Sequence, residues 1–271
     1  MIIGSPLERR FGQFIALCFG LSWLPWAALG LLKIDIGHGA GQLVFGLAAS
    51  GPSLAALVLW LGKRRERIHG SGRTTWFGLV AGLGFGAAAP VGCALILNAG
   101  GLSAIGANLS SVVADVGGPL VVIVYTLVSG PLSEEFGWRG YLQPRLRQRF
   151  GPLRTALLLG PLWAVWHLPL FLLPGTGQHR TGLLTIGGLV FFVSIVTLSY
   201  IMIFVTERLR GGVWAAVAAH AGFNAADALM PGHGTAGDVL ELSIMIALAG
   251  AVAVLWRLRP ASDQLRMPAT R

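Results

Sequence analysis

Residues 133–141 read SEEFGWRGY and follow an apolar run over residues 120–128. The stretch places two adjacent carboxylates, Glu134 and Glu135, in a chain that has almost no other acid inside its apolar segments. An acidic residue at the centre of a membrane helix costs roughly 3 kcal/mol. On a helix, Glu135 and Arg139 are one turn apart on the same face and can form an ion pair. The residue four positions after Glu134 is a tryptophan, so the stretch predicts one ion-paired carboxylate and one that is available for chemistry.

The composition identifies the class of protein. The 271-residue chain is 54% hydrophobic and 11% charged, with a mean hydropathy of +0.71. Soluble domains carry about 25% charged residues, so the chain is predicted to be an integral membrane protein. Its two cysteines, Cys18 and Cys93, both lie in apolar runs, which argues against a framework of disulfides or cysteine-bound metal.

Apolar runs recur along the whole chain, and most reach the roughly 20 residues that a membrane-spanning helix needs. We therefore predict an all-α fold: a polytopic bundle of about eight transmembrane helices that forms a single integral membrane domain over residues 1–271. The first run is too long for a signal-peptide core and is expected to be retained as a span. Residues 98–117 form the longest non-apolar stretch and are predicted to be an external loop. The runs cover about residues 11–32, 41–61, 77–97, 118–142, 155–173, 182–205, 212–229 and 238–256.

The basic residues are distributed unevenly about this arrangement. All 20 Lys and Arg residues except Lys33 and Arg180 fall on one side of the eight predicted spans. Under the positive-inside rule, this asymmetry places both termini in the cytoplasm. It also accounts for the net charge of +9 without a nucleic-acid partner, and the bilayer itself is the expected partner of some arginines. The Arg, Ala and Gly content is typical of a prokaryotic cytoplasmic membrane protein.

A few polar side chains lie inside the predicted spans besides the two glutamates. His167 is in the fifth span, and His220 and Asn224 are one turn apart on one face of the seventh. At about 1.5 Å per residue, Glu134, His167 and His220 lie roughly 12–18 Å from the arginine-rich edge. One polar pocket is therefore expected near the middle of the membrane or in its arginine-rich half. Pro169 is predicted to kink the fifth span and to free a carbonyl near His167.

Each of these residues alone could have a purely structural role, because a single His or Asn in a membrane helix often forms a hydrogen bond to a neighbouring helix. Together they are the parts of a hydrolytic site. A carboxylate and a histidine can take a proton from water, and a second histidine or an amide can stabilise an oxyanion. Alternatively, Glu134, His167 and His220 could hold a zinc ion with one open position. The chain has no His-Glu-x-x-His motif, no Gly-x-Ser-x-Gly loop and no pair of intramembrane aspartates.

Three motifs in this order resemble the CPBP intramembrane proteases. That family includes the type II CAAX prenyl endopeptidases and bacterial relatives linked to bacteriocin maturation or self-immunity. The resemblance covers about residues 118–227, and Trp163 stands where the family usually has Phe. The motifs are Glu134-Glu135-x-x-x-Arg139, Trp163-x-x-x-His167 and His220-x-x-x-Asn224.

The resemblance implies a role for each motif residue. Glu134 would act as the general base on a water that His167 shares, while His220 and Asn224 would stabilise the oxyanion. Glu135 and its arginine partner would hold the site in shape. The family resemblance implies a peptide or membrane-protein substrate. It leaves open whether the reaction uses no cofactor or a divalent metal such as zinc.

Two other functions are compatible with the same residues. One is a membrane immunity or scaffolding protein that uses the polar pocket for binding alone. The other is a proton-coupled transporter, although the chain shows neither repeat symmetry nor paired broken helices. A prenylated C-terminus is the eukaryotic family theme, and in a prokaryote a membrane protein or a peptide precursor is the more natural substrate. The sequence does not determine the oligomeric state.

Overall fold

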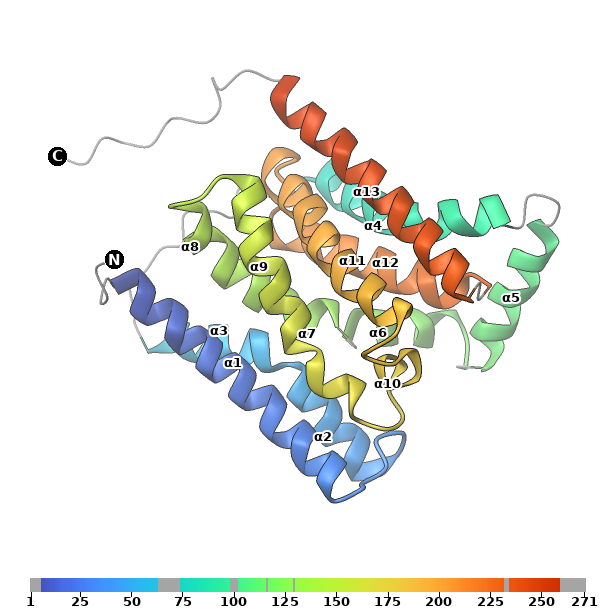
Figure 1. Ribbon diagram of the computed structural model, residues 1–271, viewed down its shortest axis with the longest axis horizontal. Coiled ribbons are helices and arrows are strands. Elements are labelled where there is room, and N and C mark those ends of the chain that lie inside the picture. Colours follow the sequence, from blue (N-terminus) through green and yellow to red (C-terminus); the bar gives the residue numbers. More distant parts are fainter. Residues whose placement is uncertain are drawn as a thin grey trace.

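The chain is helical throughout the part that the structure describes, and that part contains no β-strand (Figure 1). This confirms the all-α membrane bundle that the apolar runs predict. The structure is a computed structural model. It describes residues 6–62, 74–97, 102–115, 117–128, 130–231 and 234–258.

Each of the eight predicted runs contains helix. Five helical segments are long and apolar enough to cross a membrane, and the bent pair α2 (Gly39–Ala49) and α3 (Gly51–Leu61), which turns by 56°, is a sixth candidate. The other two runs form the helices α9 (Pro152–Trp166) and α12 (Gly212–Leu229). The count of eight spans and the cytoplasmic termini stay predictions. The five segments are α1 (Pro6–Leu31), α4 (Trp76–Leu97), Pro119–Arg147, Ile186–Arg208 and α13 (Gly234–Leu258).

Two of these segments are built from several helical pieces. Pro119–Arg147 contains α6 (Pro119–Val128), α7 (Pro131–Glu135), the π-helix η1 (Phe136–Leu142) and α8 (Gln143–Arg147). Ile186–Arg208 contains α11 (Ile186–Ile203) and a second π-helical turn, η3 (Phe204–Arg208). π-Helical turns are rare and often lie at functional sites. η1 directly follows the two glutamates, so the segment departs from regular helix where the polar residues lie.

The predicted external loop at residues 98–117 is wrong in one respect, because it contains the helix α5 (Leu102–Asp115). Its larger apolar residues recur every three or four positions, which suits an amphipathic helix. The Asn108 side chain donates a hydrogen bond of 2.7 Å to the carbonyl of Leu229, the last residue of α12. An exposed carbonyl at the end of α12 is thereby satisfied.

Close contact between α4 and α12 places the second half of the site. Gly78, Gly82 and Gly86 recur every fourth residue on α4. A Cβ added to Gly82 would overlap the carbonyl of Ala215, and one added to Gly86 would overlap the carbonyl of Ala219. The two backbones therefore touch along this glycine stripe, as small residues allow in membrane proteins. The contact fixes the height of α12 in the bundle.

Proline ends α9 near the site. The expected kink at Pro169 is in fact the end of the helix: α9 stops at Trp166, and a 3₁₀ turn, η2 (Leu168–Phe171), follows. Proline cannot donate the next helical hydrogen bond and disfavours helical geometry in the residue before it. Two carbonyls at this end accept side-chain hydrogen bonds, Trp163 from His167 at 2.8 Å and Trp166 from Trp23 at 2.9 Å. The short helix α10 (Gly177–Thr181) then leads to α11.

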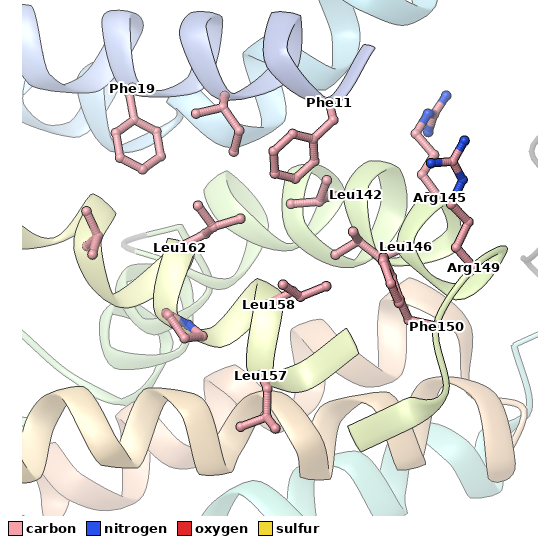
Figure 2. A pocket seen from close by; sticks show the side chains of 13 residues that line it. Phe11, Phe19, Leu142, Arg145, Leu146, Arg149, Phe150, Leu157, Leu158 and Leu162 are labelled. Atoms are coloured by element: carbon pink, nitrogen blue, oxygen red, sulfur yellow. The ribbon is translucent and has the colours of Figure 1, made fainter. Parts of the chain in front are cut away.

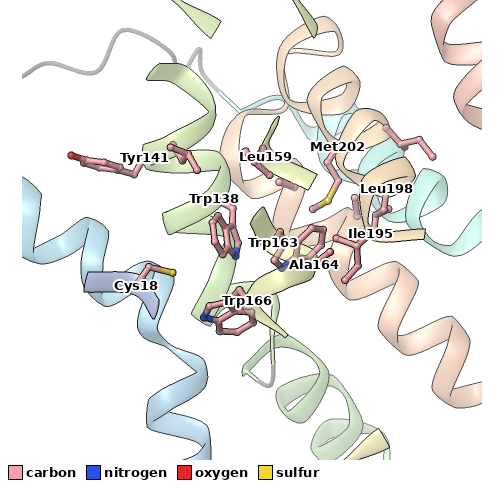
Figure 3. Packing of buried hydrophobic residues seen from close by; sticks show 14 of the residues in the cluster. Cys18, Trp138, Tyr141, Leu159, Trp163, Ala164, Trp166, Ile195, Leu198 and Met202 are labelled. Atoms are coloured by element: carbon pink, nitrogen blue, oxygen red, sulfur yellow. The ribbon is translucent and has the colours of Figure 1, made fainter. Parts of the chain in front are cut away.

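Tryptophans form the centre of the hydrophobic core. Figure 3 shows Trp138, Trp163 and Trp166 gathered between η1, α9 and the neighbouring helices. The rings of Trp138 and Trp166 meet edge to face with centroids 6.2 Å apart, and Trp26 of α1 lies 5.0 Å from Trp166. Indoles combine a large apolar surface with one N–H donor. Of these three indoles, Trp163 donates to a polar residue of the site, whereas the buried Nε1 atoms of Trp138 and Trp166 have no hydrogen-bond partner within the described structure.

Candidate active site

Glu134 lies on α7, which begins with Pro131 at its first position. Its side chain is buried. The helical spacing predicts no partner for this carboxylate, but the structure gives it one. The indole Nε1 of Trp163 donates a hydrogen bond of 2.5 Å to Glu134 Oε2. An indole is a neutral donor, so it holds the carboxylate in place without forming an ion pair. The other oxygen, Oε1, is directed toward Gly130.

Glu135 is completely buried and joins two residues. The predicted ion pair with Arg139 is present: Nη1 of Arg139 lies 3.1 Å from Oε1 and 3.0 Å from Oε2, and only the contact to Oε1 has hydrogen-bond geometry. Glu135 Oε1 also lies 2.8 Å from Nδ1 of His220 on α12. This second contact was not predicted. Glu135 therefore links α7 to α12 and orients the imidazole.

Arg139 is held on three sides. Besides Glu135, its Nη2 donates a hydrogen bond of 3.0 Å to Ser199 Oγ on α11. Its guanidinium also lies over the Trp163 ring, 4.1 Å from the ring centroid. A buried cation is stable only when it is paired and hydrogen-bonded, and the anion, hydroxyl and aromatic face supply these contacts. Arg139 thus joins α9 and α11 to η1.

The two histidine rings are oriented in the same way, because Nδ1 of each ring faces an oxygen atom that accepts a hydrogen bond. Nδ1 of His167 lies 2.8 Å from the carbonyl oxygen of Trp163. A carbonyl only accepts hydrogen bonds, so this nitrogen carries the proton. Nδ1 of His220 likewise faces the Glu135 carboxylate. In both rings Nε2 is the remaining nitrogen, and it is an acceptor when the ring is neutral.

Three of the predicted site residues meet beside Gly130. A Cβ added to Gly130 would lie 3.3 Å from Asn224 Nδ2, 3.4 Å from Glu134 Oε1 and 3.4 Å from His220 Cε1. The carboxylate, amide and imidazole therefore surround one point, and the absence of a side chain at Gly130 leaves it open. These residues and His167 line one cavity of about 890 Å³, within the roughly 300–1,000 Å³ typical of ligand pockets.

Comparison with known proteins covers the part of the chain that contains all three motifs. Residues 116–226 match the family described as type II CAAX prenyl endopeptidase Rce1-like. Residues 116–226 therefore resemble an Rce1-like domain. The chain is also 30% identical to CAAX prenyl protease 2 of Methanococcus maripaludis over 101 residues, which are 37% of each protein. The matched region thus spans little more than a third of that relative. The resemblance to the CPBP family is confirmed.

The cavity of the Rce1-like domain opens on the face that carries Lys33 and Arg180. Its mouth is lined by Asp35 and Gly37 after α1 and by residues 175–178 and Arg180 around α10. Among described residues, none of its lining comes from the arginine-rich loops. The lining therefore favours an opening on the side of Lys33 and Arg180. The expected depth of the pocket, near the middle of the membrane or in its arginine-rich half, stays a prediction.

Side chains fill the space on the arginine-rich side of the Rce1-like site. Trp138 is fully buried there. One turn further, Gln143 donates hydrogen bonds of 2.9 Å to Thr206 and to Glu207. Arg147 also pairs with Glu207 at 2.9 Å. This network joins α8 to η3 and closes that side of the site.

Charges of both signs lie at the mouth. Asp35 accepts hydrogen bonds from His38 at 2.9 Å and from the N–H of Gly37 at 2.8 Å. These bonds lower the pKa of the Asp35 carboxyl below its ordinary value, the contact with His38 being the larger cause. Arg180 donates a hydrogen bond of 3.2 Å to the carbonyl of Gly175. A polar peptide segment entering the cavity would meet a carboxylate and a guanidinium.

A metal centre does not fit the arrangement of these side chains. Zinc sites in proteins use three or four His, Cys, Asp or Glu donors. Within the described residues, no three such side chains lie close enough together to hold an ion. Glu134, His167 and His220 are thus not gathered as a ligand set, and we derive no step through a metal.

The sequence did not predict the contacts that Trp163, Gly130 and Ser199 make in the Rce1-like site. Trp163 belongs to a recognised motif, and its position one turn before His167 was the available signal for a donor at this place. Gly130 precedes α7 directly, but nothing in its neighbours points to Glu134, His220 and Asn224. Ser199 is a single hydroxyl in the apolar helix α11, and no spacing rule connects it with Arg139.

Proposed function

We propose that this chain is an intramembrane endopeptidase that hydrolyses a peptide bond with a water activated by Glu134 and His167. The observation that carries the proposal is the meeting of Glu134, His220 and Asn224 beside Gly130, in the wall of a ligand-sized cavity. General bases and oxyanion donors act only when they surround the same reacting atoms. The family match over residues 116–226 supports the same class of reaction.

Each group has a role in this mechanism. Glu134 Oε1 accepts a proton from the water, while Trp163 holds Oε2 and fixes the direction of the carboxylate. Nε2 of His167 accepts the second hydrogen bond of that water. The water oxygen then forms a bond to the peptide carbonyl carbon, and the carbonyl oxygen becomes an oxyanion. The proton held by Glu134 passes to the leaving amine as the C–N bond breaks.

Asn224 and His220 stabilise the oxyanion. The Asn224 amide donates from Nδ2. His220 donates from Nε2 in its protonated form, in which the ring is positively charged. The buried Glu135 carboxylate, 2.8 Å from Nδ1 of His220, stabilises that charge. Arg139 fixes Glu135 in turn. Glu135 and Arg139 are thus positioning residues.

The substrate that suits the cavity is a peptide or membrane protein with an apolar segment. Besides the polar mouth, the cavity is lined by Leu43 and Leu47 of α2 and by Tyr125 of α6, which are 65–69% exposed. An apolar substrate segment can lie against these side chains while its peptide group reaches Glu134. We place this activity in a prokaryotic cytoplasmic membrane. The positive-inside rule supports a cavity mouth on the external face.

Proteolysis is tested by comparing new protein termini in cells that express the wild type or Glu134→Gln at equal levels. Asp115→Asn, at an exposed position on α5, is the matched control because it removes an acid far from the site. Mass spectrometry of membrane-protein termini should find the same new termini in the wild type and Asp115→Asn cells, and none in Glu134→Gln cells. Termini that persist in Glu134→Gln would show that Glu134 is not the base. No new termini in any strain would favour the immunity or scaffolding function.

A further inference from the structure

A second groove, separate from the catalytic cavity, lies between α1 and α9. Its volume is about 620 Å³, and it shares no described lining residue with the catalytic cavity. Figure 2 shows Phe11 and Phe19 directed from α1 toward Leu142 and Leu162 across the groove. Apart from Arg145 and Arg149, all of its lining residues are apolar.

Two arginines close one end of this apolar groove. Arg145 lies on α8, and Arg149 lies in the turn that follows it, four residues further along the chain. Arg145 is buried and fixed: its Nη1 donates a hydrogen bond of 2.7 Å to the carbonyl of Tyr141, and its guanidinium lies 3.5 Å from the centroid of the Tyr141 ring. Arg149 is exposed. The groove therefore combines an apolar body with a cationic end.

The dimensions of the groove match one leaflet of a bilayer. Phe11, Ile15 and Phe19 lie on one face of α1 and line the groove over about 12 Å of helix. One leaflet contributes about 15 Å of hydrocarbon, half of the roughly 30 Å core. Arg145 and Arg149 lie on the arginine-rich side, where the positive-inside rule puts the anionic lipid heads of the cytoplasmic leaflet. An acyl chain in this groove would have its headgroup beside the two arginines.

We propose that this groove binds one anionic phospholipid from the surrounding bilayer. Its acyl chain lies between α1 and α9, and its phosphate lies against Arg145 and Arg149. Lipid tails are as apolar as the groove walls, so the chain itself adds little selectivity. Selectivity comes from the headgroup, and each arginine near the surface should change affinity for an anionic lipid about fivefold. The lipid would join α1, which precedes the Rce1-like domain, to α9 within it.

Native mass spectrometry of the purified full chain in neutral detergent tests this proposal. The protein is titrated with phosphatidylglycerol and with phosphatidylcholine of identical acyl chains. We expect one phosphatidylglycerol to bind at least tenfold more tightly than phosphatidylcholine. Glycerol phosphate, which has the anionic group without the chains, should not compete at the same concentrations. Equal binding of the two lipids, or full competition by glycerol phosphate, would overturn the proposal.

Variants locate the lipid. Arg149→Gln should weaken phosphatidylglycerol binding about fivefold, because it removes one cation at an exposed position. Arg154→Gln is the control, since Arg154 is an exposed arginine of α9 outside the groove lining, and it should leave affinity unchanged. Leu158→Trp fills the groove without altering charge and should also weaken binding. An equal loss in Arg149→Gln and Arg154→Gln, or unchanged binding in Leu158→Trp, would show that the lipid does not occupy this groove.

Discussion

The indole of Trp163 holds Glu134 through a 2.5 Å hydrogen bond from Nε1 to Oε2. The same ring lies 4.1 Å from the Arg139 guanidinium and meets the His220 ring edge to face, with centroids 5.3 Å apart. One side chain of α9 thus contacts the proposed base, the buried cation and an oxyanion donor. A phenylalanine at this position could make the ring contacts but could not donate to Glu134.

Trp163→Phe should therefore lower activity while the protein stays folded. The variant keeps an aromatic ring but loses a hydrogen bond to a carboxylate, a contact worth about 1.5–3 kcal/mol. We expect kcat to fall roughly 10- to 100-fold, because an unheld carboxylate no longer points at the water. Trp166→Phe is the matched control: within the described structure the buried Nε1 of Trp166 has no hydrogen-bond partner. Equal losses of kcat in the two variants would contradict the role of the indole N–H.

Glu134→Gln and Glu135→Gln should differ in their effect on stability. Glu135 pairs with Arg139 and His220 in a fully buried site, and removal of one partner from a buried pair costs about 3–5 kcal/mol. For a chain of this size, that is a fall in Tm of roughly 6–20 °C. Glu134 is in no ion pair among the described residues, so Glu134→Gln should lose activity with little change in Tm. Thermal unfolding in detergent measures the Tm of both variants. Equal Tm values would contradict the assignment of Glu135, and not Glu134, to the buried ion pair.

Alanine at Gly86 should separate α4 from α12. A Cβ there would overlap the carbonyl of Ala219, whereas a Cβ at Gly84 on the same helix would meet no described atom within 4 Å. Gly86→Ala should lower both Tm and activity, because α12 carries His220 and Asn224. Gly84→Ala should leave activity unchanged and raise stability slightly, since alanine favours helix over glycine. If both variants behave alike in thermal unfolding and in peptide hydrolysis, the proposed contact does not control the site.

Gly130→Ala should reduce activity with a smaller effect on folding. The added methyl group would lie 3.3–3.4 Å from Asn224 and Glu134, in the space where the water and the peptide carbonyl meet. We expect kcat/KM to fall at least tenfold with Tm within a few degrees of wild type. Gly140→Ala is the control, because a Cβ there makes only ordinary contacts of 3.7 Å or more. Wild-type kcat/KM in Gly130→Ala would place the reaction elsewhere in the cavity.

The sequence by itself determined the class of protein and the contacts within single helices. Apolar runs separated by basic loops specify a helical membrane bundle, because backbone polar groups in lipid must be satisfied internally. Helical periodicity also predicted the pair of Glu135 with Arg139 and the shared face of His220 and Asn224. Side chains four residues apart meet whatever the rest of the chain does.

Tertiary structure alone decided which helices these side chains meet and where the cavity opens. Trp163 reaches Glu134 across 29 residues of sequence, Arg139 reaches Ser199 across 60, and Glu135 reaches His220 across 85. No spacing rule spans separate helices, because their relative height and rotation are set by packing, such as the glycine contact of α4 with α12. The opening of the cavity away from the arginine-rich face follows from the same packing. The described lining of the cavity includes the loops around Asp35 and Arg180 and none of the arginine-rich loops.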